Sequence, residues 1–159
     1  MSSPLVTVII PLHDKEAYIE STLSSVARQT YRNIEIVIID DSSADESLAI
    51  ASTFLKMNES RFAKVTVVSR ANTGQAGARN DGIALAQGEL IAFLDADDLW
   101  HPDKIAKQVR FLNDNPQVDL VLCNYFMFFA NRNFVKRINL LPIKKKIKLW
   151  LLTVGYGGL

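Results

Sequence analysis

Four short apolar runs, rich in β-branched residues, recur along the first hundred positions of the chain. They cover residues 5–10, 35–39, 65–68 and 90–94. Runs that are hydrophobic almost throughout, without strict alternation, are typical of strands buried on both faces of a parallel sheet. The pattern therefore predicts strands that lie between two layers of helices.

Apolar residues between these runs recur at helical spacing, which predicts one helix after each strand. The predicted stripes are Ile19, Leu23 and Val26 in a helix that begins at 14–18; Leu48, Ala51 and Leu55 in a helix capped by Asp45; Ala78, Gly82 and Leu85 in a helix that opens within 72–82; and Ile105, Val109 and Leu112 in a helix with Pro102 in its first turn. The small residues of the third helix predict close packing on the sheet. Four strand–helix repeats predict a doubly wound, mostly parallel α/β sheet with helices on both faces.

The pattern changes after Asn115–Pro116. Residues 118–130 form an aromatic-rich apolar run that predicts a strand, and residues 134–141 are its candidate pairing partner. Residues 146–154 predict a short helix with Ile147, Trp150 and Leu151 on its inner side. We therefore place a boundary between residues 1–115 and residues 116–159.

Polar and charged residues follow each predicted strand, at 11–14, 40–45, 69–72 and 95–98. Ligands of doubly wound sheets bind outside the carboxyl ends of the strands, so these four segments predict one site. The last segment holds the acids Asp95, Asp97 and Asp98. Like charges a few Å apart repel, and a divalent Mg²⁺ or Mn²⁺ ion with oxygen ligands relieves this repulsion. A solvated turn that caps the next helix is the alternative interpretation.

Composition narrows the class of protein. All 17 acidic residues lie at or before Asp119, so the first 119 residues carry a net charge of −6 and the last 40 carry +7. The basic end is a candidate for peripheral membrane contact, or simply a solvated basic face. Nucleic-acid binding is disfavoured because no basic stripe accompanies the motifs. The single cysteine, Cys123, and the lack of a long apolar stretch predict a cytoplasmic protein. Peripheral contact with the inner face of the membrane, through the basic end, is compatible with that location.

Six segments together resemble glycosyltransferase family 2, in the family's order and spacing over about residues 4–115. They are Val8–Pro11, Leu23–Val26 with Gln29–Tyr31, Ile39–Asp45, Asn72–Gly74, Gly77–Asn80 with Gly82, and Phe93–Asp98. The resemblance implies the GT-A fold, which is Rossmann-like, and an inverting transferase that takes a nucleotide-sugar donor, with a UDP-sugar expected. It also implies a divalent metal, Mn²⁺ or Mg²⁺, and a role in cell-envelope or polysaccharide synthesis.

Residue roles follow from the resemblance. Asp97 is the expected direct metal ligand, and Asp95 would touch the metal-bound water or the ribose. Asp41 would accept a hydrogen bond from uracil N3–H, while Arg79 would meet phosphate at a helix beginning. The complete predicted nucleotide-sugar site is Pro11, His13, Asp14, Asp41, Asn72, Arg79, Asp95 and Ala96. Many relatives have Tyr-Asn where this chain has His13–Asp14. Three simpler roles stay open: Asp40 supports the turn, Asn72 turns the chain, and Arg79 forms a surface ion pair.

The resemblance also implies a carboxylate that acts as catalytic base in the acceptor-binding half. The chain has no Asp or Glu after Asp119, so that base is expected beyond Leu159. Residues 1–115 are accordingly interpreted as the nucleotide-sugar-binding subdomain, and residues 116–159 as the incomplete beginning of the acceptor-binding part. The implied partners are the donor and a carbohydrate or lipid-linked acceptor. A nucleotide-sugar-binding module without turnover is the alternative function. A nucleotidyltransferase is disfavoured because Pro11–Asp14 is not a glycine-rich basic loop.

Overall fold

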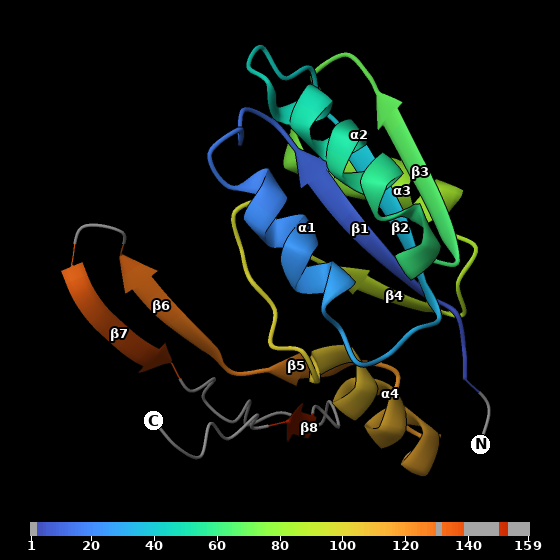
Figure 1. Cartoon of the computed structure of the whole chain (residues 1–159). Helices are drawn as coiled ribbons and strands as arrows, with labels where there is room; N and C mark the ends of the chain where they lie inside the picture. The colour runs from blue at the N-terminus through green and yellow to red at the C-terminus, as the bar shows by residue number, and fades with distance from the viewer. Residues whose placement is uncertain (1–2, 130–131, 139–149, 153–159) are drawn as a thin grey trace. The chain divides into compact units, whose positions relative to one another are not determined.

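A computed structural model describes residues 3–129, 132–138 and 150–152 (Figure 1). The chain forms two compact units, Met1–Ala106 and Lys107–Leu159, and each is described by itself. The boundary predicted at 115/116 from the sequence stays a prediction about function.

The first unit is built on a sheet of four parallel strands. These are β1 (Val6–Leu12), β2 (Ile34–Asp40), β3 (Lys64–Ser69) and β4 (Leu90–Phe93), in the order β3-β2-β1-β4. The predicted α/β class with a parallel sheet is confirmed. Every residue of β1 and β2 is buried, as predicted, because these strands are central. For β3 and β4 the prediction of burial on both faces is wrong: both lie at edges and keep exposed positions.

Helices cover both faces of this sheet. One buried cluster joins α1 (Ile19–Ala27) and α2 (Ser47–Met57) to Val8 and Ile10 of β1. The intervening residue, Ile9, packs instead with Ala78 of α3 (Gly74–Leu85). Successive side chains of a strand point to opposite faces, so α3 lies on the face opposite α1 and α2. A short 3₁₀ helix, Glu59–Arg61, leads from α2 into β3.

The helical stripes are mostly as predicted. Ile19, Leu23 and Val26 are buried, and so are Ala78 and Gly82. Leu85, the last residue of α3, is 40% exposed, and Leu48 and Leu112 are half-buried. The first helix begins at Ile19 rather than within 14–18, where the chain forms a turn.

Residues beyond β4 form α4 (Lys104–Asp114) and four short strands. The strands are β5 (Val121–Cys123), β6 (Tyr125–Phe129), β7 (Arg132–Ile138) and β8 (Trp150–Leu152). The antiparallel pairing of β6 with β7 confirms the predicted partnership over the described residues. The single strand predicted over 118–130 is instead divided at Asn124.

The prediction of a helix over 146–154 is wrong for residues 150–152, the part of it that the structure describes. Residues 150–152 form β8, which pairs in parallel with β5. A short apolar run fits either a strand or a buried helix, and here pairing with β5 decides. The rest of that segment, the end of the predicted 134–141 strand and the basic residues 144–148 lie outside the described residues, as do the side chains of Arg132, Lys136 and Arg137.

Candidate functional site

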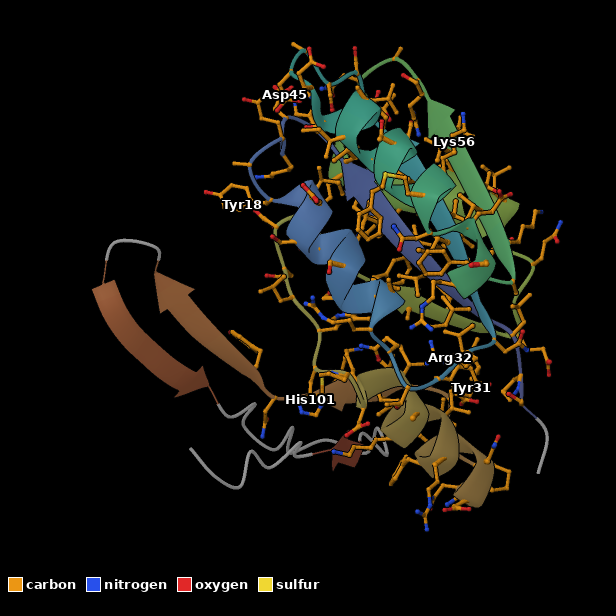
Figure 2. The ribbon with its side chains drawn as sticks, in the orientation of Figure 1. Tyr18, Tyr31, Arg32, Asp45, Lys56 and His101 are labelled. Atoms are coloured by element: carbon orange, nitrogen blue, oxygen red, sulfur yellow. The ribbon has the colours of Figure 1, made fainter. Side chains whose placement is uncertain are left out.

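The strand order places a switch point between β1 and β4. From β1 the chain adds β2 and β3 on one side, and then returns to add β4 on the other side. Loops leave the carboxyl ends of β1 and β4 in opposite directions at such a point, which leaves a crevice for ligands. Figure 2 shows Tyr18 and Asp45 at one end of the sheet, and Tyr31 and Arg32 at the other. The candidate site belongs to the former end.

Side chains join the loop after β1 to the loop after β2. Asp14 Oδ1 accepts a hydrogen bond from Ala44 N at 2.8 Å, and Asp14 N donates to Ser43 Oγ at 3.2 Å. Asp14 has φ +47° and Ser42 has φ +66°, a conformation that L residues rarely adopt. Such backbone costs about 1–3 kcal/mol and persists where the surroundings enforce it, often at functional sites.

Asp45 ties the same two loops at the start of α2. Its Oδ2 accepts from Glu16 N at 3.0 Å and its Oδ1 accepts from Ser47 N at 2.9 Å. Desolvation acts to raise the pKa of Asp45, but hydrogen bonds from Ser47 and Glu16 outweigh it and lower the pKa. The Asp45 carboxylate therefore accepts a hydrogen bond from the first residue of α2, which is close to the predicted capping role.

The two acids at the carboxyl end of β2, Asp40 and Asp41, have different partners. Asp40 accepts from Ser43 N at 3.2 Å and from Ser69 Oγ at 2.8 Å, so it supports the turn. Asp41 accepts from Thr73 N at 2.9 Å and from Gly74 N at 2.8 Å. Its side chain is only 5% exposed. Asp41 therefore holds the beginning of α3, a contact that the sequence did not reveal.

The turn that precedes α3 involves Asn72. Its Oδ1 accepts from Gly74 N at 3.1 Å, and Gly74 has φ +81°, which glycine adopts without strain. Asn72 thus turns the chain in the structure, in line with its simpler predicted role. Two further predicted residues lie near β1: Pro11 is buried within the strand, and His13 Nε2 is 3.6 Å from Asp14 Oδ2 in an exposed pair.

Arg79 projects from the second turn of α3 toward the acidic turn. Its Nη2 is 2.6 Å from Asp95 Oδ1, which also accepts from Gln75 Nε2 at 3.0 Å. The guanidinium carbon lies 6.0 Å from the centroid of the Phe93 ring. Arg79 Nε is buried and has no hydrogen bond. The structure therefore shows Arg79 as an ion-pair partner of Asp95, from a position later in the helix than the predicted beginning.

The acidic turn is fixed by its own backbone. Asp98 N donates to Asp95 O at 3.0 Å, and the carbonyl of buried Ala96 accepts from Thr22 Oγ1 at 2.9 Å. Asp97 Oδ2 is 3.0 Å from Lys15 Nζ, which comes from the loop after β1. The Asp95 and Asp97 side chains thus each contact one internal cation and remain about 40% exposed, at 39% and 42%.

These carboxylates suit a hard divalent ion. No group of three or more His, Cys, Asp or Glu residues in the described part of the chain is arranged to hold a metal by itself. Mg²⁺ at phosphate-transfer sites is usually held by one or two carboxylates together with substrate phosphates, so a complete protein cage is not required. Two accessible carboxylates in one fixed turn fit that description.

Asp98 is the third acid of this turn. Partial burial raises the pKa of Asp98, and the negative charges of Asp95 and Asp97 raise it further. Ionised Asp98 is therefore unfavourable in the folded chain. The ion pairs of Asp95 with Arg79 and of Asp97 with Lys15 do not include Asp98.

We expect Asp98→Asn to raise the Tm of the metal-free protein by about 1–3 °C at pH 7. A carboxyl whose folded pKa is raised destabilises the fold when ionised, and the penalty disappears as the pH falls through the folded pKa toward the unfolded value near 3.9. The advantage of the variant should therefore vanish near pH 4. Thermal unfolding at several pH values measures it, and a lower Tm for the variant at pH 7 would contradict it.

The chain resembles known proteins over most of its length. The family model described as "Glycosyl transferase family 2" matches residues 7–156. EpsH of Bacillus subtilis is 42% identical over 131 residues, which are 82% of this chain and 36% of EpsH. WfaP of Escherichia coli, named as a UDP-Glc:alpha-D-GlcNAc-diphosphoundecaprenol beta-1,3-glucosyltransferase, is 37% identical over 82% of this chain and 49% of its own length. The chain thus spans half or less of these two relatives.

A solved structure shares the fold. The mannosyltransferase PcManGT of Pyrobaculum calidifontis, in complex with GDP-Man and Mn²⁺, superposes with a TM-score of 0.70 and 31% identity, over 76% of this chain and 35% of its own. Within the described residues, no helix has the length and hydrophobicity needed to cross a membrane.

Proposed function

The chain belongs to glycosyl transferase family 2, and on that premise we propose that it forms the donor-binding part of a metal-dependent, inverting glycosyltransferase. The donor is a nucleotide-sugar, with UDP as the nucleotide. The observation that carries the proposal is the pair of accessible carboxylates, Asp95 and Asp97, in a fixed turn beside the β1/β4 switch point. Carboxylates at this place suit a metal–diphosphate complex.

Asp97 and Asp95 would hold the divalent ion. When bound, such an ion acts as a Lewis acid that stabilises charge on the leaving diphosphate. Arg79 of α3 pairs with Asp95 of this turn, and a guanidinium group binds phosphate as well as carboxylate. The turn thus supplies the carboxylates, and Arg79 of α3 and Lys15 of the loop after β1 supply the cations.

Asp41 remains the proposed partner of the nucleobase. An ionised carboxylate has about four lone-pair sites, and two backbone N–H groups use part of that capacity. Its nearly complete burial would make a further hydrogen bond selective for a base edge that donates there. Uracil and guanine both donate, so this contact alone does not separate UDP from GDP. The name of WfaP, which includes UDP-Glc, favours UDP.

The acceptor is proposed to be a carbohydrate or a lipid-linked glycan, used in polysaccharide or cell-envelope synthesis at the cytoplasmic side of the membrane. Support comes from WfaP, whose printed name describes a diphosphoundecaprenol acceptor. Inverting transfer also needs a general base for the acceptor hydroxyl. We assign that role to no residue of this chain, because the base is expected in the acceptor-binding part and residues 120–159 contain no Asp or Glu.

Ligand-dependent unfolding tests the proposal. UDP with Mn²⁺, at ten times the dissociation constant, should stabilise the chain by about 1.4 kcal/mol and raise its Tm by about 3–6 °C. Asp97→Asn should remove that shift, and Asp119→Asn, an exposed acid outside the site, should keep it. No shift with either UDP or GDP and Mn²⁺ would contradict the proposal. A Tm shift with GDP and Mn²⁺ but not with UDP and Mn²⁺ would identify GDP as the donor nucleotide. Donor binding without transfer to any acceptor would favour a binding module.

A further inference from the structure

We propose that Lys15 is a positioning residue that serves as the resident counter-cation of Asp97: a divalent ion displaces it, and its ammonium group then pairs with the diphosphate of the donor. This inference rests on the proposed function, because it takes Asp97 as a metal ligand. It adds a residue that the sequence motifs did not indicate. Four observations carry it: the anchoring of the Lys15 backbone, the strength of the ion pair, its place in the fold and the contrast with Arg79.

The backbone of Lys15 is anchored on both sides. Its N–H donates to Ser47 Oγ at 2.6 Å, and its carbonyl accepts from Tyr18 N and Ile19 N, each at 2.9 Å, at the entry to α1. The preceding residue, Asp14, has the positive φ that turns the chain out of β1. Lys15 therefore emerges from a fixed point, and only its flexible side chain is free to change partner.

The ion pair is close but weak. Lys15 Nζ lies 3.0 Å from Asp97 Oδ2, with side-chain exposures of 36% and 42%. Water screens pairs of this kind, and they change an equilibrium constant by no more than about fivefold. The pair is thus strong enough to neutralise part of the acidic turn in the absence of metal, and weak enough for a doubly charged ion to replace it.

The pair also joins the loops that follow β1 and β4 at the switch point. Lys15 follows β1 and Asp97 follows β4, and these two strands are neighbours in the sheet. The displaced ammonium group would remain near the carboxyl ends of β1 and β4, because hydrogen bonds anchor the Lys15 backbone there. The donor brings phosphate oxygens to the same place, and a lysine binds phosphate as a point charge with three rotatable donors.

Arg79 is less suited to such an exchange. Its guanidinium lies against the Phe93 ring, its Nε is buried, and Gln75 shares its carboxylate partner. Lys15 Nζ has Asp97 as its ion-pair partner within the described structure. A swap of partners by Lys15 links the two ligands thermodynamically: metal binding frees the cation that the diphosphate uses, so each ligand favours the other.

Binding measurements on the Lys15→Gln variant test this inference. The Mn²⁺ affinity is measured without nucleotide, by the EPR signal of free Mn²⁺, and the UDP affinity is measured by calorimetry at saturating Mn²⁺. We expect Lys15→Gln to bind Mn²⁺ alone about two- to fivefold more tightly, since no internal cation competes. We expect its UDP affinity to fall about tenfold, the scale of one lost charge-assisted hydrogen bond.

Two further variants separate this exchange from general electrostatics. Lys15→Arg keeps the charge and should resemble the wild type in both affinities. Arg32→Gln removes a charge from an exposed residue at the opposite end of the sheet and should change neither (Figure 2). Unchanged or weaker Mn²⁺ binding by Lys15→Gln overturns the inference, as does an unchanged UDP affinity. If the wild type binds no Mn²⁺ with or without UDP, the proposed function itself fails.

Discussion

Replacing Glu35 by alanine should lower the free energy of unfolding by about 2–4 kcal/mol. Glu35 is fully buried in β2, yet it carries a carboxylate. Its Oε2 accepts from Thr7 Oγ1 at 2.6 Å and from Gln87 N at 2.9 Å, and its Oε1 is 3.6 Å from Lys64 Nζ. Truncation would leave a buried hydroxyl and a backbone N–H without their acceptor, and each stranded group costs about 1–3 kcal/mol. Urea unfolding of both proteins measures the loss.

Glu35→Gln is the matched control. Its amide oxygen can still accept from Thr7 and Gln87, so the variant loses mainly the attraction to Lys64, which is half exposed. We expect it to lose about 1 kcal/mol, the lower part of the range for a single polar contact. Equal losses for the two variants would assign the stability to charge rather than to hydrogen bonds. A loss below about 0.5 kcal/mol for Glu35→Ala would show that this buried cluster does not stabilise the fold.

Gly82→Ala is the second large change, with an expected net loss of about 1–2 kcal/mol. A Cβ built on Gly82 would lie 2.3 Å from Ile9 Cγ2, and Ile9 is fully buried in a central strand. Alanine would favour the helix by about 1 kcal/mol over glycine, but the overlap with Ile9 forces α3 away from the sheet, and the overlap dominates. Thermal or urea unfolding detects the loss.

Two comparisons keep this prediction specific. Asn80→Ala places alanine on the exposed side of the same helix and should not destabilise the protein. In an Ile9→Ala background, Gly82→Ala should cost much less, because the atoms that it meets are gone, and a double-mutant cycle measures the difference. Additive effects would show that Gly82 and Ile9 do not limit how closely α3 approaches the sheet.

The elements that sequence patterns predicted well are those governed by local periodicity. The four strands of the parallel sheet and the buried positions Ala78 and Gly82 of α3 are examples. Leu85 fits the same stripe but is exposed, since periodicity does not say where the covering layer ends. The pairing of 150–152 with β5 is likewise nonlocal, and local hydrophobicity alone favoured a helix there.

The site was predictable as a set of segments but not as a set of contacts. Polar residues after four parallel strands must meet at one edge, so Asp41 and Asp95–Asp98 could be named together, and the family resemblance added Arg79. The pair between Lys15 and Asp97 depends on β4 lying beside β1, a strand order that no residue pattern encodes. The hydrogen bonds from Thr73 N and Gly74 N to Asp41 also depend on tertiary packing. The roles of the site residues in catalysis and nucleotide binding stay predictions.

The two buried acids of the β2 segment, Glu35 and Asp41, accept hydrogen bonds at opposite ends of α3. Asp41 receives N–H groups at its beginning, and Glu35 receives Gln87 N just after its end. The six residue steps from Glu35 to Asp41 span about 20 Å, and the 12 residues of α3 span about 18 Å. The distance between the two acids therefore matches the length of the helix. An insertion or deletion within α3 would break one of these attachments and rotate Arg79 away from Asp95. Homologous chains should therefore vary in length in their loops but keep the spacing between these attachments, which makes that spacing a marker for aligning distant relatives.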